Sequence, residues 1–291
     1  MSLPRRMLPR LRLAAAVSAT VAATLFATLV LAAPAAAAEP YPNSIASTGD
    51  SITRGFNACG FYLDCTSRSF STGSDTAINS HYRRILAANP AINGRNFNDA
   101  ETGATASDLP AQIDLAVGQG VDYVTVLMGA NDACAGSEAG MTPVATYRGY
   151  IDTALARLKA GRPGARVFLI SIPDLKRLWE VGKGNLLARG AWSLFGICQS
   201  MLANPTSTAA ADVARRDRVR QRVADYNGQL AAACSAYGSL CKYDGGAIFA
   251  YPFQLSQVSS WDYFHPNAAG QTVLAQVSYA NGFAWAAAPV H

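Results

Sequence analysis

Short apolar runs alternate with amphipathic stretches along this chain, and this alternation limits the folds that it can adopt. Two runs have the β-branched and aromatic residues of strands and end in turn residues: "DYVTVLMGAND" at 122–132 and "ARVFLISIPD" at 165–174. Between them, residues 142–161 repeat apolar side chains at helical spacing, at Tyr147, Ile151, Ala154, Leu155 and Leu158. Because strand, helix and strand in this order require crossover connections, we expect a mostly parallel sheet covered by helices on both faces, a three-layer α/β/α fold.

Weaker signals complete a five-stranded sheet. Further strands are predicted at 44–48, near 95–98, and near either 240–243 or 247–249. Helices are predicted at 81–88, 107–117, 142–161 (with Thr142 as cap, Pro143 in the first position and Gly161 as the stop), 215–233 and 266–284. Residues 173–214 lack a clear alternation, so we interpret them as an insertion near the rim of the sheet.

The first 38 residues have the pattern of a secretory signal peptide. Four arginines, Arg5, Arg6, Arg10 and Arg12, precede an apolar run at 13–33 and the small residues of "AAPAAAAEP". The run is long enough for a membrane anchor, but its many alanines and the Ala-x-Ala before Glu39 favour cleavage after Ala38. We therefore expect an extracellular protein with no stable membrane anchor, exported by the general secretory route rather than the twin-arginine route.

Removal of residues 1–38 changes the charge balance. The whole chain carries 24 Lys and Arg against 19 Asp and Glu, and the four arginines of the signal leave 20 against 19. Without a basic block in the remaining chain, we expect no nucleic-acid partner. Residues 39–291 are enough for one domain with a substantial core, and we expect it to be a monomer.

All six cysteines lie beyond the predicted signal, at positions 59, 65, 134, 198, 234 and 241. An even number in an exported protein indicates disulfides, although six cysteines allow 15 pairings. Short loops favour Cys59–Cys65 and Cys234–Cys241, which leaves Cys134–Cys198. A zinc site is disfavoured because no Cys-x-x-Cys occurs and the three histidines are scattered.

Chemically active residues follow four of the predicted strands. The first strand ends at Gly49-Asp50-Ser51, the second at "DAETGAT" with Gly103, the third at "GAND" with Asn131, and the fifth is followed by "SSWDYFHPNAAG" with Asp262 and His265. The carboxyl ends of parallel strands meet at one edge of a sheet, where ligands bind. A hydroxyl, an available N–H, a carboxamide and an acid–imidazole pair are the groups that acyl transfer needs.

With these four blocks in this order, the chain resembles the SGNH (GDSL) hydrolase family over residues 44–282. The blocks are "GDS" at 49–51, Gly103, "GAND" at 129–132 and "DYFHP" at 262–266. The resemblance implies a flavodoxin-like SGNH hydrolase fold over 39–291 and an ester hydrolase activity. Through "RSFSTG" at 68–73 and "ATASDLPAQI" at 104–113, the chain is also loosely similar to the phospholipase-B-like branch and to secreted actinobacterial esterases.

The family's roles transfer onto matching residues. Ser51 would be the nucleophile, His265 the base that takes its proton, and Asp262 the acid that orients the imidazole. The Ser51 N–H, the Gly103 N–H and the Asn131 amide would form the oxyanion hole. Simpler roles remain open: Gly103 as a turn residue, Asn131 as a helix cap, Asp50 as a brace of its turn. His81, in contrast, is interpreted as an ordinary helix-surface or groove residue.

The sequence also narrows the reaction class. No Gly-x-Ser-x-Gly occurs, since Thr53 holds the place of the second glycine, which argues against an α/β-hydrolase. No nucleotide-binding or His-Glu-x-x-His motif occurs, so we expect neither cofactor nor metal. Acyl esters, lipids among them, are the favoured substrates because "LWEVGKGNLLARGAWSLFG" at 178–196 offers an apolar wall for an acyl chain. The aromatic candidates for contact with the substrate are Trp179, Trp192 and Phe195 in this segment, and Phe253 outside it. The alternatives are a carbohydrate acetylesterase and a secreted binding protein without catalysis.

Overall fold

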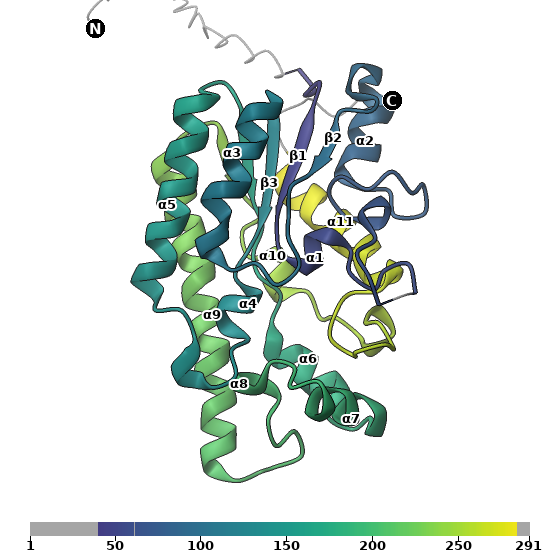
Figure 1. Ribbon diagram of the computed structural model, residues 1–291, viewed down its shortest axis with the longest axis vertical. Coiled ribbons are helices and arrows are strands. Elements are labelled where there is room, and N and C mark those ends of the chain that lie inside the picture. The colour runs from purple at the N-terminus through teal and green to yellow at the C-terminus, as the bar shows by residue number, and fades with distance from the viewer. Residues whose placement is uncertain (1–39, 61, 284–291) are drawn as a thin grey trace, which may run out of the picture. The chain divides into compact units, whose positions relative to one another are not determined.

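The computed structural model describes residues 40–60 and 62–283, so the predicted signal peptide at 1–38 lies outside the described residues. A five-stranded sheet with all neighbours parallel forms the centre, in the order β2-β1-β3-β4-β5 (Figure 1). The predicted α/β class and the parallel five-stranded sheet are confirmed. The strands are β1 (Ile45–Gly49), β2 (Asn96–Asn98), β3 (Tyr123–Leu127), β4 (Arg166–Leu169) and β5 (Cys241–Tyr243).

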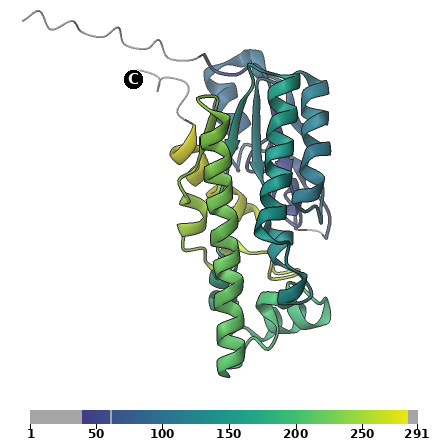
Figure 2. The ribbon, with the colours of Figure 1, turned by 90° about the vertical axis from the view of Figure 1, so that its left-hand side faces the viewer.

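Helices cover both faces of the sheet. The helices α3, α5 and α9 pack side by side on one face, and α2 and α11 lie on the other (Figure 2). The longer helices are α2 (His81–Ala88), α3 (Leu109–Gln119), α5 (Val144–Gly161), α6 (Leu175–Gly182), α7 (Leu186–Leu194), α9 (Ala210–Tyr237) and α11 (Ala268–Gly282). The shorter ones are α1 (Ser51–Arg54), α4 (Ala130–Ala133), α8 (Gln199–Leu202) and α10 (Ala247–Ala250). Single turns of 3-10 helix occur at Thr66–Arg68, Pro90–Ile92, Ala106–Asp108, Glu138–Gly140 and Leu255–Gln257.

The strand order explains where a site forms. β1 pairs with β2 on one side and with β3 on the other, and β1 and β3 are buried along their whole length. The chain therefore leaves β1 toward one edge and later returns to its other side. This reversal opens a crevice beyond the carboxyl ends of β1 and β3, which is where open parallel sheets bind ligands.

Several predicted boundaries differ from the structure. The fifth strand is the first of the two alternatives, and the second, at 247–249, lies within helix α10. Thr142 is not the cap of α5, because its N–H donates to the Asp132 carbonyl and its own carbonyl accepts from Tyr226 and Arg222. The N-cap position of α5 falls on Pro143, and Gly161 is its last helical residue rather than its stop.

The C-terminal helices also begin at other residues than predicted. α9 begins at Ala210, five residues before the predicted start at 215, and continues to Tyr237. α11 begins at Ala268, where the side chain of Asn267 caps it by accepting from the Gly270 N–H at 3.1 Å. The predicted end of this helix at 284 lies outside the described residues.

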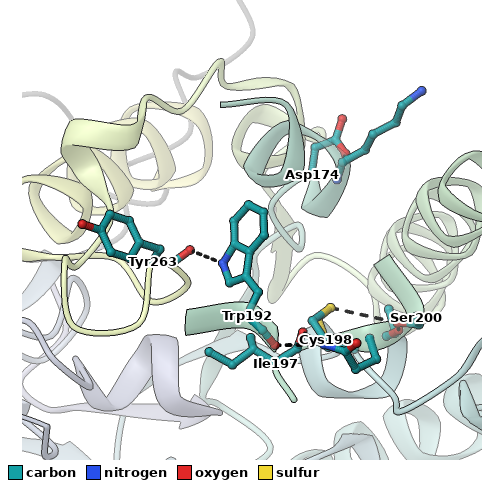
Figure 3. Close-up of a disulfide and its surroundings, with 10 residues drawn as sticks. Asp174, Trp192, Ile197, Cys198, Ser200 and Tyr263 are labelled. Atoms are coloured by element: carbon teal, nitrogen blue, oxygen red, sulfur yellow. Dashed lines mark hydrogen bonds between the residues drawn. A yellow bond between two sulfur atoms is a disulfide. The ribbon is translucent and has the colours of Figure 1, made fainter. Parts of the chain in front are cut away.

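Residues 173–214, predicted as an insertion, contain α6, α7, α8 and the first turn of α9. A disulfide between Cys134 and Cys198 joins this segment to the loop after β3 (Figure 3). On its other side, the Trp192 indole N–H donates to the Tyr263 carbonyl at 2.9 Å, as Figure 3 also shows. These two links hold the inserted helices beyond the carboxyl ends of the strands.

Two further disulfides, Cys59–Cys65 and Cys234–Cys241, close short loops, as loop length predicts. Cys134–Cys198 is the pair that then remains. Within the part of the chain that the structure describes, no helix is both long and apolar enough to cross a membrane.

His81 does not lie on the helix surface, and the interpretation of it as a surface or groove residue is wrong. Its side chain is completely buried between the sheet and α11, with Nδ1 3.1 Å from the Tyr123 hydroxyl and Nε2 2.8 Å from the Ser278 hydroxyl. Burial lowers the pKa of His81 to about 3. The imidazole is therefore neutral at ordinary pH and serves as a polar link within the core.

Candidate active site

A tight turn between β1 and α1 presents Ser51. Gly49 has φ +141°, and a Cβ at this position would lie 2.2 Å from the Leu127 carbonyl oxygen of the neighbouring strand, so only glycine fits. The Gln112 side chain braces the same residue by accepting from its N–H at 2.7 Å and donating to its carbonyl at 2.9 Å. Ser51 is consequently fixed as the first residue of α1.

Asp50 caps that helix, which confirms its predicted role as a brace of the turn. Its Oδ1 accepts from the Ile52 N–H at 2.9 Å, while the buried Oδ2 has no hydrogen-bond partner. Burial raises the pKa of Asp50 to about 7, although the hydrogen bond from the Ile52 N–H and the nearby His265 side chain lower it. An ionisable carboxyl thus lies directly beside the candidate nucleophile.

Ser51, His265 and Asp262 form a continuous hydrogen-bonded chain. The Nε2 atom of His265 lies 2.8 Å from Ser51 Oγ, and its Nδ1 lies 2.6 Å from Asp262 Oδ2. Asp262 is almost fully buried, and its Oδ1 accepts from the backbone N–H groups of Phe264 and His265. The tight turn expected from the three-residue spacing therefore places both side chains on the same side.

The hydrogen-bond partners of His265 indicate which of its ring nitrogens carries the proton. An ionised Asp262 can only accept, so His265 carries its proton on Nδ1, and Nε2 is left to accept from the Ser51 hydroxyl. This is the tautomer in which an imidazole can act as a base toward a serine.

Asn57 is a fourth member of this hydrogen-bonded series, and the sequence analysis did not predict it. Its side-chain amide donates to Asp262 Oδ2 at 2.7 Å, and the residue is almost fully buried with φ +66°. Asparagine is among the residues that tolerate a positive φ. The only sequence signal for Asn57 was its position six residues after Ser51, in "GFNACG". This position does not reveal its hydrogen bond to Asp262, which lies 205 residues further along the sequence.

The three candidate oxyanion donors come from α1, the loop after β2 and the segment after β3. The backbone N–H groups of Ser51 and Gly103 donate to no acceptor among the described residues. Gly103 has φ +89°, so it also fills the role of a turn residue. Asn131 does not cap α4, whose N-cap is Gly129, and instead donates from Nδ2 to the Ala104 carbonyl at 2.8 Å.

A second contact holds the same two loops together. The buried Asp132 accepts from the Ala106 N–H at 2.9 Å, and burial raises its pKa. Together with the bond from Asn131 to Ala104, it fixes the Gly103 loop against the "GAND" segment. Donors held in this way need little rearrangement when charge develops on a substrate.

An almost wholly apolar groove extends along α6 from Ile52 and Ala130, which in the sequence directly follow Ser51 and directly precede Asn131. We call it the acyl-side groove. Its apolar walls are formed by Ile52, Ala130, Pro173, Leu175, Leu178, Val181, Phe253, Val258, Phe264 and Pro266. Of the four aromatics considered from sequence, only Phe253 lines it, whereas Trp192 is buried, Trp179 donates to the Pro205 carbonyl, and Phe195 is exposed.

None of the described residues belongs to a cluster of three or more His, Cys, Asp or Glu side chains that could hold a metal ion. The groups around Ser51 are instead those of a nucleophile, a base and hydrogen-bond donors. This arrangement can activate a hydroxyl and stabilise an oxyanion.

Comparison with known proteins assigns the family. The model of the GDSL-like lipase/acylhydrolase family matches residues 48–273, which include Ser51, Gly103, Asn131 and His265. The chain belongs to this family. The protein is accordingly a carboxylic ester hydrolase of the GDSL type. No curated protein shows significant similarity to the sequence.

One solved structure shares the fold at low sequence identity, and two others align over most of their length. A GDSL-like lipase from Parabacteroides merdae superposes with a TM-score of 0.53 at 14% identity, covering 84% of this chain and 96% of that one. An extracellular lipase from Streptomyces rimosus gives 0.45 at 21% identity, covering 82% and 99%. Phospholipase A1 from Streptomyces albidoflavus gives 0.45 at 18% identity, covering 84% and 100%.

Proposed function

We propose that this GDSL hydrolase cleaves acyl esters through a covalent acyl-enzyme on Ser51. The observation that carries the proposal is the unbroken chain from Ser51 through His265 to Asp262, with links of 2.8 and 2.6 Å. A serine hydroxyl is a weak nucleophile unless a base within hydrogen-bond reach takes its proton. His265 is in that position before any substrate arrives.

The reaction proceeds in two halves. Ser51 Oγ attacks the ester carbonyl carbon while His265 Nε2 takes the hydroxyl proton, and Asp262 stabilises the imidazolium that results. The tetrahedral intermediate then expels the alcohol, which leaves with the proton from Nε2. A water molecule attacks the acyl-enzyme with His265 again as base, and the carboxylic acid departs as Ser51 regains its proton.

The oxyanion is stabilised by groups that are already positioned. The N–H groups of Ser51 and Gly103 and the Asn131 side-chain amide are the proposed donors, and the Asn131 amide keeps a second N–H besides the one given to Ala104. Each such donor lowers the barrier by roughly 3–4 kcal/mol. All three are uncharged, so their donor strength does not change with pH.

The acyl-side groove supports acyl esters with apolar chains as substrates. It begins at Ile52 and Ala130, the neighbours of the nucleophile and of Asn131, and it is lined further along by Leu178 and Val181 of α6. An acetyl group would leave this apolar surface exposed to water, whereas a longer chain would cover it at about 0.8 kcal/mol for each buried CH₂ group. Lipids and other acyl esters are therefore the proposed substrates, ahead of acetylated polysaccharide.

Export fits the same proposal. The predicted signal at 1–38 would deliver residues 39–291 to the extracellular space, and the three disulfides suit an oxidising compartment.

A rate panel tests this function. Short and long acyl esters, a phospholipid and acetylated xylan are offered to the wild type, to Ser51→Ala and to His265→Ala, with Ser74→Ala, an exposed serine, as the matched control. Wild type and control should prefer the longer chains, and the two site variants should lose activity by about four orders of magnitude or more while remaining folded. Substantial turnover by either site variant would refute the assignment of the nucleophile or base. Preference for acetylated xylan would refute the acyl-chain substrate, and no turnover at all would favour a binding protein.

A further inference from the structure

The helix α7 is apolar on both of its sides although it lies at the surface. Leu186, Leu187 and Leu194 are 75%, 70% and 79% exposed, whereas Ala188 and Trp192 on the other side are fully buried. Leu186 and Leu194 are eight residues apart and thus share one stripe of the helix. An exposed leucine stripe on a helix whose other side is already buried normally has a second apolar environment.

The exposed stripe continues toward the catalytic base through a row of aromatic rings. Phe195, which directly follows α7, lies 6.4 Å from Tyr62 between ring centroids. Tyr62 lies 5.0 Å from Phe56, and Phe56 lies 4.8 Å from the His265 ring. Figure 1 shows α7 beyond the carboxyl ends of the strands, the same edge of the sheet at which α1 follows β1. Ser51 is the first residue of α1. The apolar surface and the catalytic site are therefore continuous.

We infer that this surface docks the enzyme on anionic phospholipid membranes or aggregates, so that ester groups enter the site from a lipid surface. The surface, called here the lipid-facing rim, consists of Tyr62, Leu63, Leu186, Leu187, Leu194 and Phe195, each between 49% and 79% exposed. The inference rests on the proposed function, because it assigns the source of the acyl ester. It adds a binding surface that the ester chemistry alone does not require.

Charge favours an anionic lipid as the occupant. No acidic residue occurs between Glu180 and Asp212, while Arg189 lies within α7 and Lys183 lies three residues before it. Asp64, which follows Leu63, is paired with Arg54 at 2.9 Å. Lys183 is exposed and contacts the face of the Trp179 ring at 4.1 Å. Apolar side chains flanked by cations are the features that bind a helix into the headgroup region of an anionic bilayer.

The position of the rim disfavours a protein as the occupant. A second copy or another protein seated on Phe195 and Tyr62 would cover the ring row that ends at His265. Such a partner would restrict access to the nucleophile, whereas a lipid surface supplies the substrate through the same opening.

Vesicle binding by a catalytically inactive protein tests the inference without any turnover. The mature chain carrying Ser51→Ala is mixed with sedimentable vesicles of phosphatidylcholine with and without phosphatidylglycerol. The test variant adds Leu186→Gln, Leu187→Gln and Leu194→Gln, which keep helix propensity. The control adds Leu115→Gln instead, on an exposed leucine of α3 on the helical face formed by α3, α5 and α9. The rim variant should bind anionic vesicles about tenfold or more weakly than the control.

The same leucine substitutions in the active enzyme separate docking from chemistry. Hydrolysis of a water-soluble short ester should remain within about twofold, while hydrolysis of vesicle phospholipid should fall in proportion to the lost binding. Equal vesicle binding by rim and control variants, or no vesicle binding by Ser51→Ala itself, would overturn the inference. A dimer that the leucine substitutions dissociate, without vesicle binding, would overturn it in favour of a second copy. If Ser51→Ala binds vesicles through the rim but the wild type cleaves no ester, the docking stands and the proposed function fails.

Discussion

Asp262 holds His265 in place, and Asn57 holds Asp262. The Asp262 carboxylate accepts four hydrogen bonds, and the one from Asn57 comes from the segment that follows Ser51, the proposed nucleophile. Asn57 thereby links the segment that follows Ser51 to the segment that carries Asp262 and His265. We interpret it as a positioning residue, because it contacts neither Ser51 nor the position of the substrate directly.

Asn57→Gly tests this role without straining the backbone, since glycine accepts the same positive φ. Loss of one hydrogen bond to a charged group is worth about 1.5–3 kcal/mol, so kcat should fall by about tenfold or more while KM changes little. Asn79→Gly is the matched control, because Asn79 also has a positive φ, 50°, but is exposed at the start of α2. Steady-state kinetics with a short ester, together with thermal melting, measure both effects. An unchanged kcat in Asn57→Gly, or an equal loss in Asn79→Gly, would contradict the role.

At the scale of elements, His81 joins α2 to β3 and α11. The Ser278 hydroxyl donates to the Leu274 carbonyl, so it accepts from His81 Nε2, and Nδ1 is left to accept from Tyr123. A second proton on the ring would bring a charge into the core and disturb this arrangement. The packing of α2 and α11 on the sheet therefore depends on a neutral His81.

Acid should weaken this contact in a defined pH range. The pKa of His81 is lowered from 6.5 in an exposed state to about 3 in the fold, so the unfolded chain binds more protons between these values. The stability contributed by a neutral His81 is complete above about pH 6.5 and is lost as the pH falls toward about 3, by about 1.4 kcal/mol for each pH unit.

Denaturant unfolding of wild type and His81→Gln from about pH 8 to about pH 4 measures the effect. The variant should be less stable at the upper end, because its side chain packs less well, and the difference should shrink as the pH falls below about 6.5. A difference that stays constant over this range would show that His81 does not couple protonation to folding.

At the scale of the whole molecule, the site depends on the order of strands rather than on any local motif. Ser51 and His265 are 214 residues apart and meet because Ser51 directly follows β1 and His265 lies in the segment between β5 and α11, beyond the same edge of the parallel sheet. A parallel sheet places all carboxyl strand ends at one edge, and for this reason the first and last sequence blocks were sufficient to predict that Ser51 and His265 would lie close together. The roles of Gly103 and Asn131 beside them stay a prediction.

What the sequence did not reveal depends on packing between distant segments. The partner of Asn57 and the burial of His81 follow from loops and helices that sequence periodicity does not position. Thr142 has the composition of a helix cap, but tertiary hydrogen bonds to its backbone override that preference. The exposed stripe of α7 has the same apolar composition as a core helix, so only the structure shows that Leu186 and Leu194 face outward.

Covalent labelling of the folded protein with a serine-directed phosphonate, followed by peptide mass analysis, tests directly whether Ser51 is the nucleophile. We expect one adduct, on Ser51, that forms much more slowly in His265→Ala because the hydroxyl then lacks its base. Labelling of the folded wild type at another residue, or no labelling at all, would contradict the assignment of Ser51 as nucleophile. An equal labelling rate in His265→Ala would contradict the assignment of His265 as its base.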